Sequence, residues 1–160
     1  MSEIEISRLA DDHYTWATNL IRDRWGSTRV VSRGRVYQAD ALPGFVATRD
    51  GVPVGLVTYN MSADECEIVT LDSVMERAGV ASNLIEAVKG LAARHKCRRL
   101  WLITTNDNTA AIRFYQKRGF NLRNVYPDAI TKSRQLKPEI PMLGIDNIPI
   151  RDEIELDMSL

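Results

Sequence analysis

The chain has 160 residues, enough for one domain, and its 21 basic side chains balance its 21 acidic ones, so the formal net charge is zero. Binding of nucleic acid through charge needs a surplus of cations, so nucleic acid is not an expected partner. No apolar run approaches the ~18 residues of a membrane span, and the acidic N-terminus has no apolar signal segment, so we expect a cytoplasmic protein with no membrane partner.

The first part of the chain predicts a strand, a helix and an irregular segment. Residues 4–9 alternate apolar and polar side chains, as a half-buried strand does. Asp11 and Asp12 are suitable N-caps for the helix that follows, and Gly26 is suited to end it. Residues 27–44 are rich in arginine and show no clear period.

Three strands of an antiparallel meander are predicted next. Two apolar segments, 45–49 and 52–61, flank an Asp50-Gly51 pair that favours a tight hairpin turn. A third strand is expected from about Glu65 to Val74. Strict alternation along it would place one set of side chains on one face and the rest on the other. The first set is Glu65, Glu67, Val69, Leu71 and Ser73, and the second is Ile68, Thr70 and Asp72.

The next elements are a helix, a buried strand and a second helix. Residues 82–95 carry an apolar stripe at helical spacing. Residues 98–105 form a nearly continuous apolar run, as expected of a strand buried on both faces. Another helix is expected from Asn108 to Gly119. The helix between the two strands would cross over the sheet, so that the third meander strand and the strand at 98–105 run parallel.

The rest of the sequence predicts a strand at 120–126, a short helix at 129–136 capped by Asp128, and a final alternating strand at 153–160. This order of elements indicates one mixed α/β domain over residues 1–160. The last strand can complete the sheet or pair with a second subunit, so a homodimer remains an open alternative.

The segment from Glu76 to Ala81 links a strand to the start of a helix. A tight turn at a helix N-terminus presents backbone N–H groups that lack helical partners, and these groups can bind a pyrophosphate. Small residues at Gly79 and Ala81 would let the backbone approach the anion, and Ser82 adds a hydroxyl. The alternative is an ordinary strand-to-helix turn. The glycine patterns of dinucleotide folds and of nucleotide-triphosphate loops are absent from the sequence.

The helix that follows Asn108 supplies a second set of candidate residues. Asn108 is a good N-cap, and that role alone could explain it. Ala111 and Tyr115 are four residues apart and share a helix face, on which the small alanine leaves room for a ligand. Tyr115 can be a buried core aromatic or a proton donor near the strand ends.

These residues together resemble the GNAT superfamily of acyl-CoA N-acyltransferases. The resemblance rests on Gly79-Val80-Ala81 after a meander strand and on the segment from Asn108 to Phe120 about 30 residues later. It covers roughly Phe45 to Phe120. The fold it implies has a mixed, mostly antiparallel central sheet, a splayed parallel strand pair and helices on both faces. Acetyl-CoA is the implied co-substrate, lying in the splay.

The resemblance also implies which residues contact the coenzyme. Its pyrophosphate is expected at the loop, its pantetheine arm along the third meander strand, and Asn108 and Tyr115 beside the arm and the sulfur. The implied binding residues are Leu71, Asp72, Ser73, Arg77, Ala78, Gly79, Val80, Ala81, Ser82, Asn108 and Tyr115. Two features depart from the family's pattern: Glu76 stands where Gln or Arg is usual, and the stretch from Ser73 to Gly79 is about two residues short.

The implied reaction moves an acetyl group to a primary amine by direct attack, without an acyl-enzyme. Tyr115 would be the general acid for the departing thiolate, and Glu67 is the leading candidate for the base, with Asp72 as its rival. A solvated strand charge at Glu67, and a proton relay through water, are the alternatives. Cys66 and Cys97 are interpreted as buried small hydrophobes, and with only His13 and His95 besides, no metal is expected.

The acceptor is expected to be the amine of a small molecule or a peptide. Five arginines lie between positions 22 and 35 and either form a solvated face or bind an acceptor carboxylate or phosphate: Arg22, Arg24, Arg29, Arg33 and Arg35. The helix at 129–136 and the prolines after it can form a lip over the acceptor pocket. The competing function is a non-catalytic acyl-CoA-binding module with a regulatory or interaction role.

Overall fold

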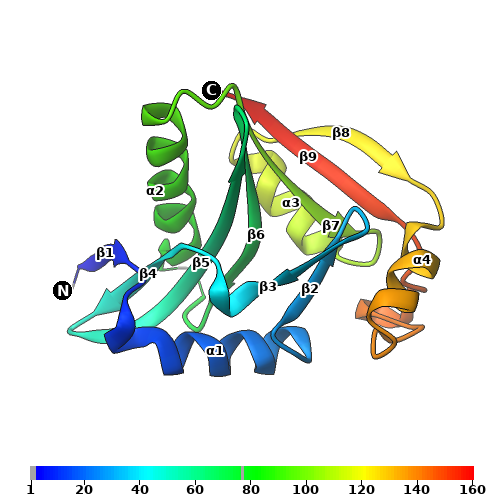
Figure 1. The fold of residues 1–160 in the computed structure, drawn as a ribbon, viewed down its shortest axis with the longest axis horizontal. Helices are drawn as coiled ribbons and strands as arrows, with labels where there is room; N and C mark the ends of the chain where they lie inside the picture. Colours follow the sequence, from blue (N-terminus) through cyan, green and yellow to red (C-terminus); the bar gives the residue numbers. More distant parts are fainter. Residues whose placement is uncertain (1–2, 77) are drawn as a thin grey trace.

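A computed structural model describes residues 3–76 and 78–160 as a mixed α/β fold built on a seven-stranded sheet (Figure 1). The strand order is β1-β4-β5-β6-β7-β9-β8, and every neighbouring pair is antiparallel except β6 and β7. The expected sheet, with its parallel pair, is therefore confirmed. The strands are β1 (Ile4–Arg8), β4 (Gly44–Arg49), β5 (Val52–Ser62), β6 (Glu65–Ser73), β7 (Arg99–Thr105), β8 (Asn121–Tyr126) and β9 (Glu153–Ser159).

Helices cover both faces of this sheet (Figure 1). One face packs against α2 (Val80–Arg94) and α3 (Thr109–Lys117), and the other packs against α1 (Asp11–Trp25). Helix α4 (Ala129–Leu136) lies at the far end of the sheet, after β8. No helix in the described part of the chain is long and apolar enough to cross a membrane.

Helix α1 ends as predicted, but it begins differently. Gly26 follows Trp25 with φ +79°, a left-handed conformation that glycine adopts without strain. The N-cap is Ala10, whose side chain cannot cap, and Asp11 and Asp12 lie in the first turn instead. There their charges still favour the helix, because they face the positive end of its dipole.

The predicted meander is confirmed, including its first turn. Asp50 and Gly51 both have positive φ, 53° and 77°, as a two-residue hairpin turn with the right twist requires. Strands β4, β5 and β6 then pair in sequence order. Both cysteines are buried and free, Cys66 on β6 and Cys97 after α2, as expected of small hydrophobes.

The arginine-rich segment is more regular than the sequence predicts. Strands β2 (Arg29–Ser32) and β3 (Arg35–Gln38) form a hairpin, followed by the short 3-10 helix η1 (Ala39–Ala41). Its turn is Arg33-Gly34, again with two positive φ values. Val30 and Tyr37 point into the core beneath α1, so the hairpin is held to the sheet by a small apolar face.

The C-terminal strand β9 lies between two earlier strands of the sheet. Strand β9 pairs with β7 on one side and with β8 on the other. Helix α2 crosses from β6 to the parallel β7, as predicted. The two faces of β7 differ in burial. Leu100 and Leu102 on one face are buried, whereas Trp101 and Ile103 on the other face are only partly buried, because each of them lines a cavity.

Candidate active site

The site begins where the two parallel strands part. The pairing of β6 with β7 ends with Ile68 opposite Leu102, although β6 continues to Ser73 and β7 to Thr105. Beyond Ile68, the edge of β6 that faced β7 has no strand partner in the described part of the chain. The strands therefore leave an opening with unpaired backbone groups along one wall.

A β-bulge in β6 explains the separation. Tyr59 of β5 is opposite Ile68, whereas its neighbour Thr58 is opposite Thr70, so Val69 is an extra residue on β6. A bulge bends its strand and interrupts regular pairing. The bulge directly follows the last residue of β6 that pairs with β7, so it turns the end of β6 away from β7.

The same bulge corrects the predicted faces of β6. Leu71 packs with the core on the α2 side, whereas the Asp72 carboxylate accepts a hydrogen bond from Trp25 Nε1 of α1 at 2.9 Å. Glu67 also points to the α1 side. Glu67 and Asp72 thus share a face, contrary to strict alternation, because the extra residue reverses the alternation beyond it.

The opening between the strands is a cavity of about 450 Å³, here called the splay cleft. Its walls come from β6, β7, the end of α1 and the inner face of α3. Of the predicted coenzyme residues it includes Leu71, Asp72, Asn108 and Tyr115, and Ala111 lies between the last two, as its small size suggests. The side chain of Ser73 turns away, because its Oγ donates to the carbonyl of Met75 at 2.6 Å.

The predicted anion loop lies at the N-terminus of α2. Gly79 is the N-cap with φ +76°, which explains the need for glycine there. The N–H groups of Val80, Ala81 and Ser82 donate to no acceptor within the described residues. Glu76 is exposed, and the predicted contact Arg77 lies outside the described residues. The loop therefore offers several free amide donors at the positive end of a helix.

Two neighbours shape this loop, and the sequence analysis missed both. Arg118, just after α3, donates from Nε to the Ser82 hydroxyl at 2.7 Å and stacks over the Phe114 ring at 3.6 Å. It brings a positive charge to the loop. Gly55 of β5 lies directly under α2: a Cβ there would clash with the side chain of Val80 and approach Leu84 Cδ1 to 3.1 Å.

Tyr115 and Asn108 lie at the inner end of α3. Asn108 caps the helix by accepting from the N–H of Ala111 at 3.2 Å, and it also lines the splay cleft. The Tyr115 ring packs edge-on against Phe120, with centroids 5.4 Å apart. Burial and the charge of Asp72 raise the pKa of Tyr115 above its usual value, so the phenol keeps its proton at neutral pH. It is thus both a core aromatic and a potential proton donor.

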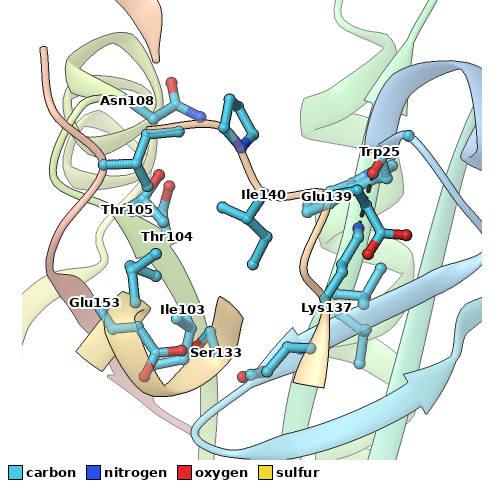
Figure 2. Close-up of a pocket in the computed structure, with 18 of the residues that line it drawn as sticks. Trp25, Ile103, Thr104, Thr105, Asn108, Ser133, Lys137, Glu139, Ile140 and Glu153 are labelled. Carbon is cyan, nitrogen blue, oxygen red and sulfur yellow. Dashed lines mark hydrogen bonds between the residues drawn. The ribbon is translucent and has the colours of Figure 1, made fainter. Parts of the chain in front are cut away.

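A second cavity, of about 500 Å³, adjoins the splay cleft and is here called the acceptor pocket (Figure 2). Figure 2 shows Thr104, Thr105 and Glu153 along one wall, with Trp25 and Lys137 along the facing wall. Helix α4 and the segment after it close one side, as the predicted lip would. Six residues line both cavities: Arg24, Trp25, Val69, Ile103, Thr104 and Asn108.

Glu67 is a buried member of the acceptor pocket and not a solvated strand charge. Its side chain accepts from Ser32 Oγ at 2.6 Å and from the Tyr37 hydroxyl at 2.7 Å. Burial raises the pKa of Glu67, while these two hydrogen bonds and the charge of Arg35 oppose the rise. Glu67 also borders a third, more exposed cavity of about 400 Å³ beside the hairpin, so it lies between the pocket and a polar opening.

The rival base, Asp72, has a different environment. Its bond to Trp25 Nε1 ties β6 to the end of α1. Burial raises the pKa of Asp72, while that bond and the charge of Arg24 oppose the rise. Asp72 lines the splay cleft and not the acceptor pocket, whereas Glu67 lines the acceptor pocket and not the splay cleft.

The five arginines of the N-terminal cluster have different partners. Arg24 lies at the junction of the two cavities and donates to the Ser73 carbonyl at 3.2 Å. The other four lie outside the lining of the acceptor pocket. Arg22 bonds to Asn19, Arg29 to the Leu136 carbonyl and Arg33 to Glu153, and Arg35 stacks over Tyr37.

Ser32 and Lys137 are further site residues that the sequence analysis did not select. Ser32 lies on the hairpin, whose Val-Val and Val-Tyr pairs around Arg33-Gly34 were the available signal. Lys137 had no signal, because a lysine before a proline is typical of an exposed loop. Among the described residues no cluster of three or more metal-ligand side chains occurs.

Both the sequence and the fold of this chain are similar to those of known acetyltransferases. The sequence profile of the acetyltransferase (GNAT) family matches residues 9–120. The chain is 41% identical over 138 residues to the Bacillus subtilis "Uncharacterized protein YdhI", with 86% of each chain covered. The solved structure of IAA acetyltransferase from Bacillus cereus has a TM-score of 0.74 at 20% identity, covering 99% of this chain and 100% of that one.

A further solved structure contains the coenzyme. A GNAT family acetyltransferase from Elizabethkingia anophelis with acetyl-CoA bound has a TM-score of 0.71 at 16% identity, covering 98% of each chain. At these identities the two structures show a shared fold. A solved protein with this fold, the one from Elizabethkingia anophelis, therefore binds acetyl-CoA.

Proposed function

Because the chain belongs to the acetyltransferase (GNAT) family, we propose that it transfers an acetyl group from acetyl-CoA to a primary amine, without an acyl-enzyme. The observation that carries the proposal is the continuity of the two cavities. The splay cleft and the acceptor pocket share six lining residues, so two ligands can meet there. Holding both reactants together replaces a bimolecular encounter with an oriented one.

The coenzyme fits the residues around the splay cleft. The amides of Val80, Ala81 and Ser82 at the N-terminus of α2 have no acceptor among the described residues, and with Arg118 beside them they suit a pyrophosphate. The unpaired edge of β6 near Leu71 suits the amides of a pantetheine arm. Bound acetyl-CoA supplies the thioester whose acetyl group is transferred.

Glu67 and Tyr115 would handle the protons. An amine attacks only when neutral, and an alkylamine with a pKa near ~10.4 is almost entirely protonated at pH 7. Glu67 lies in the acceptor pocket and would take that proton. The new N–C bond then forms as the C–S bond breaks, and the Tyr115 hydroxyl would donate a proton to the departing sulfur. The attacking nitrogen loses a second proton as the amide forms, and a proton from solvent would restore the Tyr115 hydroxyl. Cys66 and Cys97 take no part, since both are buried away from the two cavities.

The test is release of free thiol when the protein, acetyl-CoA and a panel of primary amines are mixed. We expect at least one amine to be consumed in equal amount to the thiol released. Glu67→Gln should lower that rate by about 100-fold or more, because general base catalysis contributes about 10²–10⁴. The matched control is Glu86→Gln, an exposed carboxylate on α2, which should not change the rate. Binding of acetyl-CoA with no amine consumed under any condition would contradict catalysis and favour a binding module.

A further inference from the structure

Lys137 is a buried cation on the wall of the acceptor pocket. Its residue exposure is 6%, although it lies directly after α4 near the surface of the fold. Its Nζ donates to the carbonyl of Trp25 at 2.8 Å, at the end of α1 (Figure 2). An ammonium group has three N–H donors, and this bond uses one of them.

No carboxylate lies within ion-pair distance of this charge in the described chain. Lys137 has no ion-pair partner within 4.0 Å there, and Glu139, which lines the same pocket, is exposed. Burial lowers the pKa of Lys137, whereas the more distant charge of Glu139 opposes that effect. A buried ammonium without a directly paired carboxylate is costly, so a purely structural role for Lys137 explains its position poorly.

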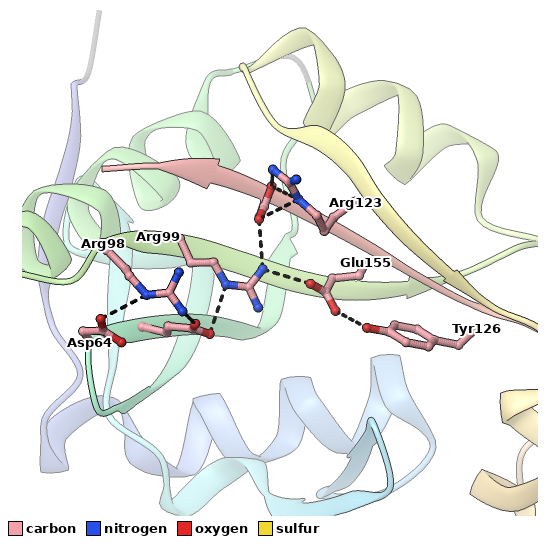
Figure 3. Close-up of polar contacts among 8 residues, drawn as sticks. Asp64, Arg98, Arg99, Arg123, Tyr126 and Glu155 are labelled. Carbon is pink, nitrogen blue, oxygen red and sulfur yellow. Dashed lines mark hydrogen bonds and ion pairs between the residues drawn. The ribbon is translucent and has the colours of Figure 1, made fainter.

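Arg99 shows how this protein treats a partly buried cation that serves structure (Figure 3). Its guanidinium pairs with Glu65 at 3.0 Å and with both Glu155 and Asp157 at 2.9 Å. Arg33, which is more exposed, also pairs with the buried Glu153 at 2.9 Å. These cations lie among carboxylates of the same chain. Lys137 differs from both, because its nearest polar partner is a neutral carbonyl and its other side is a cavity.

The remainder of the pocket is apolar on several sides and carries three carboxylates. Trp25, Val30, Ile103 and Ile140 contribute apolar surface. Glu153 is buried and paired with Arg33, and Glu139 is exposed, whereas Glu67 is buried and has no ion-pair partner within 4.0 Å in the described chain. A pocket lined by apolar groups with a few polar ones fixes both the class and the orientation of its ligand. Here Glu67 suits a cation and Lys137 suits an anion.

We propose that the acceptor is a small primary amine that also carries a carboxylate, and that Lys137 binds this carboxylate while the amine points to Glu67. The inference rests on the proposed function and specifies its substrate class. The pocket volume of about 500 Å³ suits a small molecule with an apolar body.

The first test uses matched pairs of acceptors with the unmodified protein. Apolar amino acids, such as leucine and phenylalanine, are compared with their C-terminal amides at a constant acetyl-CoA concentration. We expect kcat/KM to favour the carboxylate by about 10- to 100-fold, which is typical of a hydrogen bond to a charged group. The amine of an amino acid amide is less basic than that of the free acid, so a larger fraction of it is neutral at the same pH. A larger supply of neutral, reactive amine therefore cannot explain a preference for the acid. Equal turnover of both members would overturn the inference.

The second test removes the charge. Lys137→Met keeps the apolar stem and should raise the KM of the amino acid by about 10- to 100-fold, with little change for the amide. Lys132→Met, at an exposed position of α4, is the control. Acetyl-CoA affinity, measured by calorimetry, should be equal in all three proteins. An equal rise in KM for the amino acid and its amide would show a structural role for Lys137 and contradict the inference.

Failure of the proposed function would give a different result. If no amine releases thiol, the transfer reaction is wrong, and the pocket is then probed by calorimetry with leucine and leucinamide on protein saturated with CoA. Binding of leucine that is weakened by Lys137→Met would still support carboxylate recognition. Binding of neither ligand, or of both alike, would reject it. Should Lys137→Met not fold, the comparison of acid with amide on the unmodified protein decides alone.

Discussion

Burial gives Glu67 its chemical character. Glu67 lies on a central strand, where the β2–β3 hairpin covers its side chain, and it is only 3% exposed. Ser32 and Tyr37 both direct hydroxyl protons at it. Burial and the bond to Glu67 raise the pKa of Tyr37, so that hydroxyl stays protonated and keeps donating. The hairpin thus holds a carboxylate in place beside the pocket.

The pH dependence of stability tests this environment. Burial raises the folded-state pKa of Glu67 above its unfolded value near ~4.3. Its stabilising contribution is therefore fully present below the unfolded pKa and is lost as the pH rises through the folded pKa. Glu67→Gln cannot titrate, so its free energy of unfolding should improve relative to the unmodified protein between about pH 4.5 and 7.5. Urea unfolding at these two pH values measures the change, and a constant difference would contradict the burial effect.

Tyr115 can be tested without disturbing its packing. Tyr115→Phe keeps the edge-on contact with Phe120 and removes only the hydroxyl. We expect kcat to fall by about 100-fold or more, since loss of a general acid costs about 10²–10⁴, while the affinity for acetyl-CoA changes little. Tyr14→Phe, at an exposed position of α1, serves as the control. An unchanged kcat would assign Tyr115 to packing alone.

At the scale of elements, the extra residue at Val69 has the largest effect on the site. It coincides with the end of the β6–β7 pairing and brings Glu67 and Asp72 to one face. The alternation of apolar and polar residues in the sequence has no feature that marks this bulge. A bulge arises from how two strands align, and a single strand's sequence contains no record of its partner's register.

The contact between β5 and α2 gives a second prediction at this scale. Gly55→Ala would place a Cβ against Val80 and 3.1 Å from Leu84 Cδ1. The start of α2 must then move away from the sheet, so we expect weaker acetyl-CoA binding and a loss of about 1–3 kcal/mol in unfolding free energy. Calorimetry and urea unfolding measure the two effects.

A glycine on α2 itself, away from the contact with Gly55, provides the control for this change. A Cβ at Gly90 meets nothing closer than 3.4 Å, so Gly90→Ala should raise helix stability by roughly 0.8–1 kcal/mol and leave coenzyme binding unchanged. Equal acetyl-CoA affinity and equal changes in unfolding free energy in the two variants would mean that the packing of α2 on β5 does not position the loop.

Most elements were predictable because their signals are local. The Asp50-Gly51 turn, the stop at Gly26 and the apolar stripe of α2 each depend on a few neighbouring residues, and each prediction is confirmed. The hairpin at 29–38 was missed because its strands are short and its arginines conceal two apolar pairs. The residues chosen by motif on the α2 loop and on α3 stay a prediction as coenzyme contacts. For the second cavity the sequence indicated Glu67 and a lip at 129–136, but not Ser32 or Lys137, because these residues meet only in three dimensions.

For the whole molecule, acetyl-CoA binding should appear as added stability. A ligand that binds only the folded state at 100 times its Kd adds about 2.7 kcal/mol. For a chain of this size that corresponds to roughly 2–4 °C in Tm for each kcal/mol. Thermal unfolding should therefore shift upward with acetyl-CoA and not with an acetylated thiol that lacks the nucleotide. Equal shifts with both compounds would contradict binding at the α2 loop.

Helix α4 and the segment after it contribute to the acceptor pocket from a part of the chain remote from the coenzyme loop. They supply Ile130, Ser133, Lys137, Ile140 and Ile150 to that pocket, whereas the splay cleft takes only Ile145 from this part of the chain. On the proposed function, exchanging residues 129–141 for another sequence of equal length would alter the acceptor preference and leave the donor unchanged. The two substrates would then be recognised largely by different segments of one polypeptide, so that new acceptor preferences could arise without rebuilding the part proposed to hold the nucleotide.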